Sequence, residues 1–155
     1  MRRALPIVAF VLLCLAVGWV SGLTTEAAIV AWYRPLVKPP WTPPDAVFPI
    51  AWTILYLLMG IAAGLVWRRR HRDRRRAIGW FLVQLAFNVL WSPVFFGLHS
   101  PAGGLAVILL LLAALVATLV AFFAISRTAF WLLVPYLLWV GYATTLTIAI
   151  CALNP

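Results

Sequence analysis

Four long stretches of the chain carry no charged residue, and they limit the kind of fold that it can adopt. They cover residues 4–25, 46–67, 77–126 and 128–155. A helix that crosses the hydrocarbon core of a membrane needs about 20 apolar residues. Because backbone polar groups in lipid must be hydrogen-bonded within the protein, runs this long predict membrane-spanning helices.

The run 77–126 is long enough for two spans, and a cluster of turn-forming residues interrupts it near residues 97–104. The other runs fit one span each. Two thirds of the residues are hydrophobic and one in ten is charged, which also excludes an ordinary soluble domain. The sequence therefore predicts an all-α membrane protein, a single domain over residues 1–155 built as a bundle of five transmembrane helices. We expect these helices near residues 5–23, 47–67, 78–98, 104–125 and 130–152.

Basic residues predict the orientation. The short loop 68–76 holds seven arginines, and placing it inside also places Arg2, Arg3 and Arg127 inside. Ten of the twelve basic residues then face the cytoplasm, as the positive-inside rule expects. We expect the N-terminus and residues 68–76 inside, in a bacterial cytoplasmic (inner) membrane. The net charge of +9 is interpreted as a topology signal and not as nucleic-acid binding. For the arginine loop, contact with anionic lipids is the alternative.

The expected outer loop, residues 24–46, belongs to the most irregular part of the chain. Six of the eleven prolines and three of the nine tryptophans lie between Trp32 and Trp52. Proline lacks a backbone donor and clashes with the preceding turn, so this segment cannot be a regular helix. Since the rest of the chain is almost all membrane helix, we look here first for a binding site.

No Asp, Glu, Lys or Arg lies inside a predicted span, which argues against ion pumps and proton-coupled carriers. The two cysteines, Cys14 and Cys151, and the two histidines, His71 and His99, show no metal-binding spacing, so we expect no metal site. We interpret His99 as an ordinary turn residue.

Uncharged polar and aromatic residues recur at helical spacing. Asn88, Trp52 and Trp139 are expected to converge from three helices towards the outer half of the bundle. Tyr136 and Ala143 share the helix face of Trp139, with Tyr142 close beside it. An indole-lined pocket under a stiff loop suits a large, flat, apolar ligand. The alternative is that these residues only join helices through hydrogen bonds.

Small residues indicate close helix contacts. Gly60 and Gly64 are four residues apart on the second helix, and Ala113, Ala117 and Ala121 repeat at the same spacing on the fourth. Small residues at this spacing let helix backbones approach closely. The contact could lie within one chain or in a homodimer, and both alternatives stay open.

Three blocks of sequence carry a family resemblance. They are Trp32-Tyr33 with Lys38-Pro39-Pro40-Trp41-Thr42-Pro43-Pro44 and Phe48 to Tyr56, then Gln84 to Gly97, then Pro135 to Trp139. In this order, and with the same helix count, they resemble the TspO/MBR family of tryptophan-rich sensory proteins and translocator proteins, also known as peripheral-type benzodiazepine receptors. The resemblance covers nearly the whole chain.

The resemblance implies a bundle, often dimeric, that binds porphyrins such as protoporphyrin and haem in a cleft under the loop between helices one and two. No cofactor is expected to be required, and porphyrin or haem is the ligand. Basic groups at the mouth would meet the porphyrin carboxylates. Carried over by motif, the ligand-binding positions would be Trp32, Tyr33, Trp41, Trp52, Tyr56, Asn88, Trp91, Trp139 and Ala143, with Arg34 and Lys38 at the mouth.

Mammalian relatives also bind sterols. The sterol motif proposed for them needs a tyrosine followed by a basic residue at the end of helix five. The chain from Leu146 onward has neither, and such motifs are weak evidence in any protein. We therefore expect tetrapyrroles as the partners, and sterols or other lipids stay a secondary alternative.

These observations predict an integral membrane protein that binds porphyrin or haem as a sensor or translocator. Two alternatives stay open. One is an enzyme that degrades porphyrin under light, with Trp52 and Trp139 as the candidate catalytic residues. The other is a transporter of porphyrin or lipid. We favour binding over catalysis.

Overall fold

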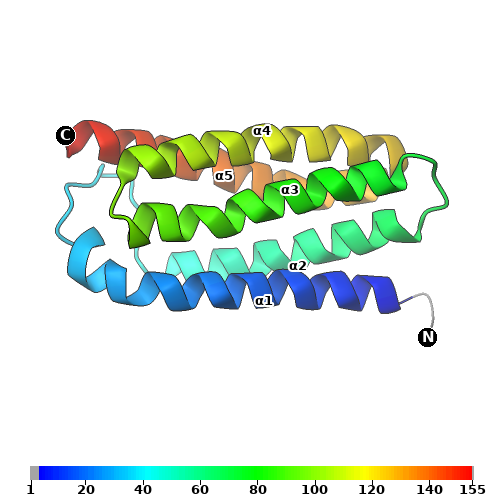
Figure 1. Ribbon diagram of the computed structural model, residues 1–155, viewed down its shortest axis with the longest axis horizontal. Coiled ribbons are helices and arrows are strands. Elements are labelled where there is room, and N and C mark those ends of the chain that lie inside the picture. The colour runs from blue at the N-terminus through cyan, green and yellow to red at the C-terminus, as the bar shows by residue number, and fades with distance from the viewer. Residues whose placement is uncertain (1–3, 155) are drawn as a thin grey trace.

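The computed structural model describes residues 4–154, without the side chains of residues 24, 26 and 27. Its long helices run side by side along one axis (Figure 1). Within the described residues, five helices are long and apolar enough to cross a membrane and no strand is present, which confirms the predicted fold class. The elements are α1 (Leu5–Ala28), η1 (Ile29–Tyr33), α2 (Val47–Arg68), α3 (Arg74–Ser92), η2 (Pro93–Gly97), α4 (Pro101–Ile125) and α5 (Arg127–Leu153).

The irregular loop is shorter than the range 24–46 that the sequence suggests. Helix α1 and the π-helical turn η1 carry the helical backbone to Tyr33. Residues 24–33 contain no proline, and the chain leaves the helix only where the prolines begin, at Pro35. Helix α3 starts at Arg74 instead of near residue 78. Arginine is a good helix former, so the arginines before residue 78 extend the helix.

Serine caps set the starts of the last two helices. The Ser100 Oγ accepts a hydrogen bond from the Gly103 N–H (3.1 Å), and Pro101 occupies the first helical position of α4. The Ser126 Oγ accepts one from the Ala129 N–H (3.3 Å) at the start of α5. Serine at the N-cap and proline directly after it are both preferred at helix starts. The turns on either side of α4 can therefore be short.

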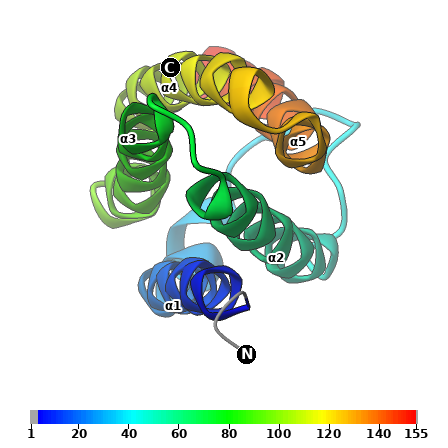
Figure 2. The ribbon, with the colours of Figure 1, turned by 90° about the vertical axis from the view of Figure 1, so that its right-hand side faces the viewer.

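Viewed along the bundle axis, α2 lies between α1 and α5, and α4 lies between α5 and α3 (Figure 2). The turn between α2 and α3 lies at the end where α1 begins, while the loop after η1 and the end of α5 lie at the opposite end (Figure 1). The structure thus separates the arginine-rich turn from the proline-rich loop. Which end faces the cytoplasm stays a prediction.

The glycines of α2 serve contacts within the chain. A methyl group at Gly60 would collide with the backbone of Val11 on α1. One at Gly64 would place its carbon 2.5 Å from the Ile7 Cα, again on α1. These two glycines therefore set the close crossing of α1 and α2. Of the small residues on α4, Ala113 is exposed and so does not serve a close contact within the chain. A homodimer stays a prediction.

We expect Gly60→Ala to lower the stability of the bundle by about 1–3 kcal/mol, because the added methyl group overpacks the crossing. Thermal unfolding of the purified protein in detergent, followed by circular dichroism, measures the change. Gly79→Ala is the matched control, since a methyl group there would meet nothing within 4 Å. Equal melting temperatures for the two variants would contradict this account of the crossing.

Candidate functional site

Asn88 joins three helices inside the bundle. The Tyr56 hydroxyl of α2 donates a hydrogen bond to the Asn88 Oδ1 of α3 (2.5 Å), and the Asn88 Nδ2 donates one to the Tyr136 hydroxyl of α5 (2.9 Å). All three side chains are buried. Because lipid offers no competing hydrogen-bond partner, an amide at this depth needs protein partners, and the two tyrosines supply them.

Aromatic rings pack against this network on the side nearer the proline-rich loop. The Trp52 ring stacks on Tyr56 with centroids 5.5 Å apart. It meets Trp139 and Tyr136 edge to face, at 6.5 Å and 6.2 Å. Phe48 also meets Trp139 edge to face, at 6.0 Å. Edge-to-face and offset contacts of this kind are favourable, so the indoles of α2 and α5 hold fixed positions relative to one another.

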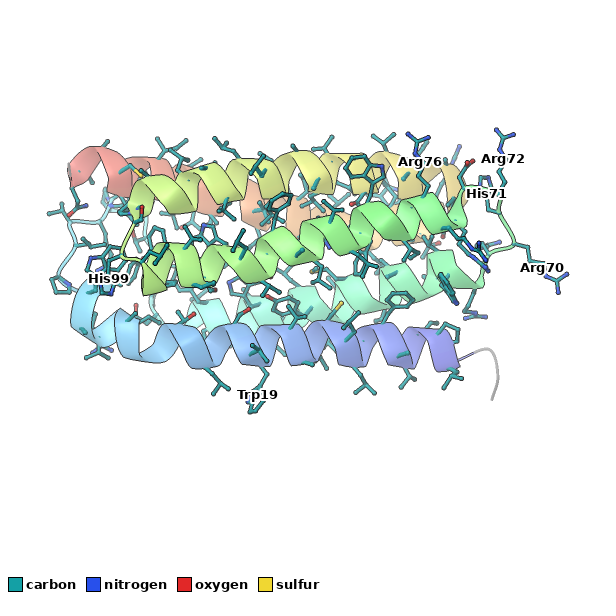
Figure 3. The ribbon with its side chains drawn as sticks, viewed as in Figure 1. Trp19, Arg70, His71, Arg72, Arg76 and His99 are labelled. Carbon is teal, nitrogen blue, oxygen red and sulfur yellow. The ribbon has the colours of Figure 1, made fainter. Side chains whose placement is uncertain are left out.

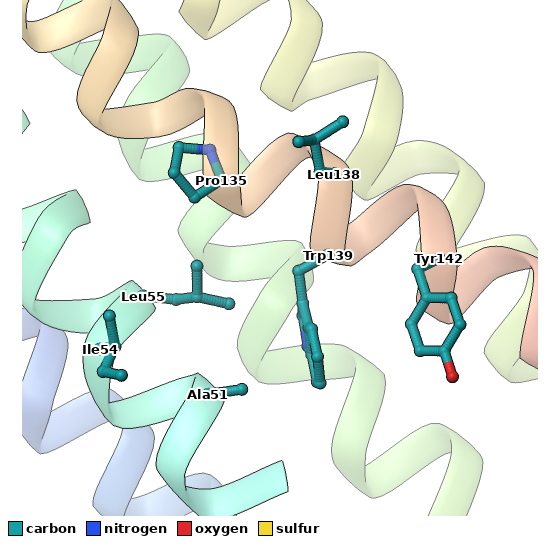
Figure 4. Close-up of a pocket in the computed structure, with 7 residues that line it drawn as sticks. All are labelled: Ala51, Ile54, Leu55, Pro135, Leu138, Trp139 and Tyr142. Carbon is teal, nitrogen blue, oxygen red and sulfur yellow. The ribbon is translucent and has the colours of Figure 1, made fainter. Parts of the chain in front are cut away.

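A groove lies between α2 and α5 beside these indoles. Its volume is about 500 Å³, and it opens at the side of the bundle, where Ile54 and Leu138 are exposed. In the close-up, Trp139 and Tyr142 project from α5 as neighbouring aromatic rings (Figure 4). The seven lining residues are Ala51, Ile54, Leu55, Pro135, Leu138, Trp139 and Tyr142. The groove is therefore apolar, partly aromatic and accessible from the side on which lipid would lie.

A second aromatic cluster lies where η1 meets η2. Trp91 stacks on Phe95 at 4.8 Å, and Tyr33 packs against Phe96 at 5.6 Å. Trp32 stacks on His99 at 4.9 Å, so His99 does more than complete a turn. Its φ of 51° is the left-handed conformation that ends the helix. Three expected ligand-binding residues, Trp32, Tyr33 and Trp91, thus have their ring partners in this cluster.

The proline-rich loop is attached to α5 at two points. The Tyr142 hydroxyl donates a hydrogen bond to the Trp41 carbonyl oxygen (2.7 Å). The Asn154 side chain binds both backbone groups of Val37, accepting from its N–H and donating to its oxygen, each at 3.0 Å. Tyr142 contacts Trp139 at 5.9 Å, so the loop lies directly beside the groove.

The two basic residues expected at the mouth have partners within the protein. Arg34 forms an exposed ion pair with Asp45 (3.7 Å). The Lys38 Nζ donates to the Arg34 carbonyl oxygen (3.0 Å) and lies 4.7 Å from the centre of the Tyr33 ring. Burial, and then the nearby Asp45 and Tyr142, raise the pKa of Tyr33 above its ordinary value, so its phenol is neutral beside Lys38.

The structure brings together four of the expected site residues. They are Trp52, Tyr56, Asn88 and Trp139. Ala143 packs against the same core, and the Trp41 side chain is exposed while its backbone binds Tyr142.

Three residues outside the ligand-binding set carried over by motif also lie at the site: Phe48, Tyr136 and Tyr142. Their helical spacing relative to Trp139 marks Tyr136 and Tyr142 as its neighbours. Phe48 had no such signal beyond its place in the second-helix motif.

A model of the TspO/MBR family matches residues 10–153. The chain belongs to the TspO/MBR family. It is 43% identical over 145 residues to the tryptophan-rich protein TspO of Chlorobaculum tepidum, which covers 92% of each chain. It is 45% identical over 123 residues to the tryptophan-rich sensory protein of Cereibacter sphaeroides, covering 79% of this chain and 77% of that one. The human translocator protein is 40% identical over 118 residues, covering 74% and 70%. Together with the five apolar helices, membership of the TspO/MBR family identifies an integral membrane protein.

We expect Tyr136→Phe to destabilise this TspO/MBR bundle by roughly 0.6–2 kcal/mol, because it removes the acceptor for the Asn88 amide while keeping the ring. Unfolding in mixed detergent micelles measures the loss. Tyr142→Phe removes a hydroxyl from the same helix at a half-exposed position and should cost less. The role of the Asn88 network would be contradicted if Tyr136→Phe unfolded like the wild type.

Asn154→Ala should release the loop at Val37. We expect faster hydrogen exchange at the Val37 amide, since its acceptor is removed, while the core helices keep their protection. Mass spectrometry of a peptide from residues 34–46 measures the rate. Asn154→Asp keeps an acceptor oxygen and should retain most of the protection. Unchanged exchange in the alanine variant would show that other contacts hold the loop.

Proposed function

We propose that this TspO/MBR protein binds tetrapyrroles, porphyrin or haem, in the groove between α2 and α5. The position of Trp139 is the observation that supports this most. Its indole lines the groove and packs edge to face against the Trp52 ring. A flat, apolar macrocycle can stack on an aromatic wall of this kind. The volume of about 500 Å³ also falls within the range of ordinary ligand pockets.

The charged groups of the ligand would lie at the loop end of the groove. Its lining is largely apolar, and its polar side-chain groups are the Trp139 indole N–H and the Tyr142 hydroxyl, which already binds Trp41. Arg34 and Lys38 lie on the loop at the same end of the bundle. The ion pair of Arg34 with Asp45 is exposed and therefore contributes little, so exchanging Asp45 for a propionate of the ligand costs little.

The groove opens towards lipid, so the ligand would enter from the bilayer and not from water. An apolar macrocycle partitions into membranes, and this route needs no opening of the loop. The proposed role is that of a sensor or translocator, consistent with the names of the relatives. Asn88 lies behind the aromatic wall and orients it through Tyr56 and Tyr136.

Titration with protoporphyrin tests the proposal. We expect a saturable red shift of its main absorbance band with the protein in nanodiscs. Trp139→Phe should weaken binding about two- to tenfold, because the indole stacking surface is lost. Trp131→Phe is the matched control, since this exposed tryptophan of the same helix does not line the groove.

Two results would defeat the proposal. One is the absence of a saturable change in wild-type protein above that in empty nanodiscs. The other is equal weakening by the Trp139 and Trp131 variants, which would assign the signal to ligand dissolved in the lipid around the protein.

A further inference from the structure

The turn between α2 and α3 carries a cluster of positive charge that the ligand groove does not involve. Residues 68–76, which we call the basic turn, hold seven arginines and one carboxylate, Asp73. Arg72 and His71 both approach that carboxylate, at 3.3 Å and 3.7 Å. Within the described part of the chain, the other arginines of the turn form no ion pair. Most of this charge therefore lacks a counter-ion from the protein.

The Arg74 side chain already binds within the protein, to Trp67. Its Nη1 donates a hydrogen bond to the Trp67 carbonyl oxygen (3.0 Å), and its guanidinium lies 4.6 Å from the centre of the Trp67 ring. The first turn of α3 contains three arginines and no acidic residue. This is the end of a helix where the macrodipole favours anions, so charge and dipole act in the same direction.

The position of the basic turn limits which anion it meets. Helix α2 ends at Arg68 and α3 begins at Arg74, and both helices are long enough to span the membrane. Trp67 and Trp80, close to the two helix ends, are partly exposed, as expected for residues at the membrane boundary. The most concentrated anions at this depth are the phosphates of lipid headgroups.

The arginines of the turn differ in direction. Arg72 and Arg76 extend sideways, across the bundle axis, whereas Arg70 extends along the axis and beyond the end of the bundle (Figure 3). A guanidinium that points sideways at this depth can reach a headgroup phosphate with two N–H groups. One that points along the axis reaches only water. Arg76 can therefore be compared with Arg70, which carries the same charge but points in a different direction.

We propose that the basic turn binds an anionic phospholipid through Arg76, which forms no ion pair among the described residues, and through Arg72, which exchanges its exposed and therefore weak ion pair with Asp73 for the phosphate. Both guanidinium groups donate hydrogen bonds to the headgroup phosphate. Arginine suits this contact better than lysine because its planar fork matches two phosphate oxygens. The site lies at the end of the bundle opposite the proline-rich loop, and it does not depend on what the groove between α2 and α5 binds (Figure 1).

The test uses the full chain in neutral detergent, titrated with short-chain phosphatidylglycerol and followed by native mass spectrometry. We expect saturable binding of phosphatidylglycerol and much weaker binding of phosphatidylcholine of the same chain length. Free inorganic phosphate, followed by its effect on the melting temperature, should not replace the lipid. Arg76→Gln should weaken lipid binding about fivefold, as expected for one basic residue at a membrane surface. Arg70→Gln removes the same charge and should weaken binding less than twofold.

Equal losses in the Arg76→Gln and Arg70→Gln variants would overturn the site and leave only diffuse charge attraction. Equal binding of phosphatidylcholine, or full replacement by free phosphate, would also overturn it. Arg76→Lys keeps the charge that sets topology and stays informative if Arg76→Gln does not fold. It should bind with intermediate affinity, and binding as tight as that of the wild type would refute the two-point contact.

Discussion

The hydrogen bonds of Asn88 hold the centre of this bundle together. A carboxamide inside a membrane protein has no water to bind, so its position is decided by the partners that the protein supplies. Tyr56 and Tyr136 provide them from α2 and α5. Through Tyr56 the network also supports Trp52, and through Trp52 it supports Trp139. The Asn88 network therefore supports the aromatic wall of the groove, together with the contacts of Phe48 and Tyr142 to Trp139.

Side chains of α5 attach the proline-rich loop to the bundle, while its own backbone forms short turns such as the hydrogen bond from the Thr42 N–H to the Pro39 oxygen (3.0 Å). Tyr142 binds the loop at Trp41 and also lines the groove, while Asn154 binds it at Val37. The prolines limit the conformations that the free loop can adopt, which reduces the entropy lost when it is attached. A molecule in the groove would touch the same tyrosine that holds the loop, so the two are physically coupled.

The helices were predictable because hydropathy and length alone demand them. The helix ends were less predictable. Residues 24–33 continue the helical backbone of α1 because no proline interrupts them, so the loop is shorter than expected. Of the candidate site, spacing and motif brought Trp52, Asn88 and Trp139 together, as the structure does. The same motifs did not place Trp32 and Tyr33 in a second cluster, apart from the main core, with Trp91 packed against both. That separation depends on the π-helical turns η1 and η2, which rotate side chains away from the regular helical spacing.

The sequence by itself determined the number of spans, the membrane environment, the family and the identity of the aromatic residues, because these follow from local composition and motif. Only the tertiary structure shows that α1 packs against Gly60 and Gly64. It also shows that Tyr142 and Asn154 bind the proline-rich loop, and that the groove opens between α2 and α5. These features depend on contacts between residues far apart in the chain. The spacing of Gly60 and Gly64 indicated a close helix contact, but the partner helix and the other contacts follow only from how the helices cross.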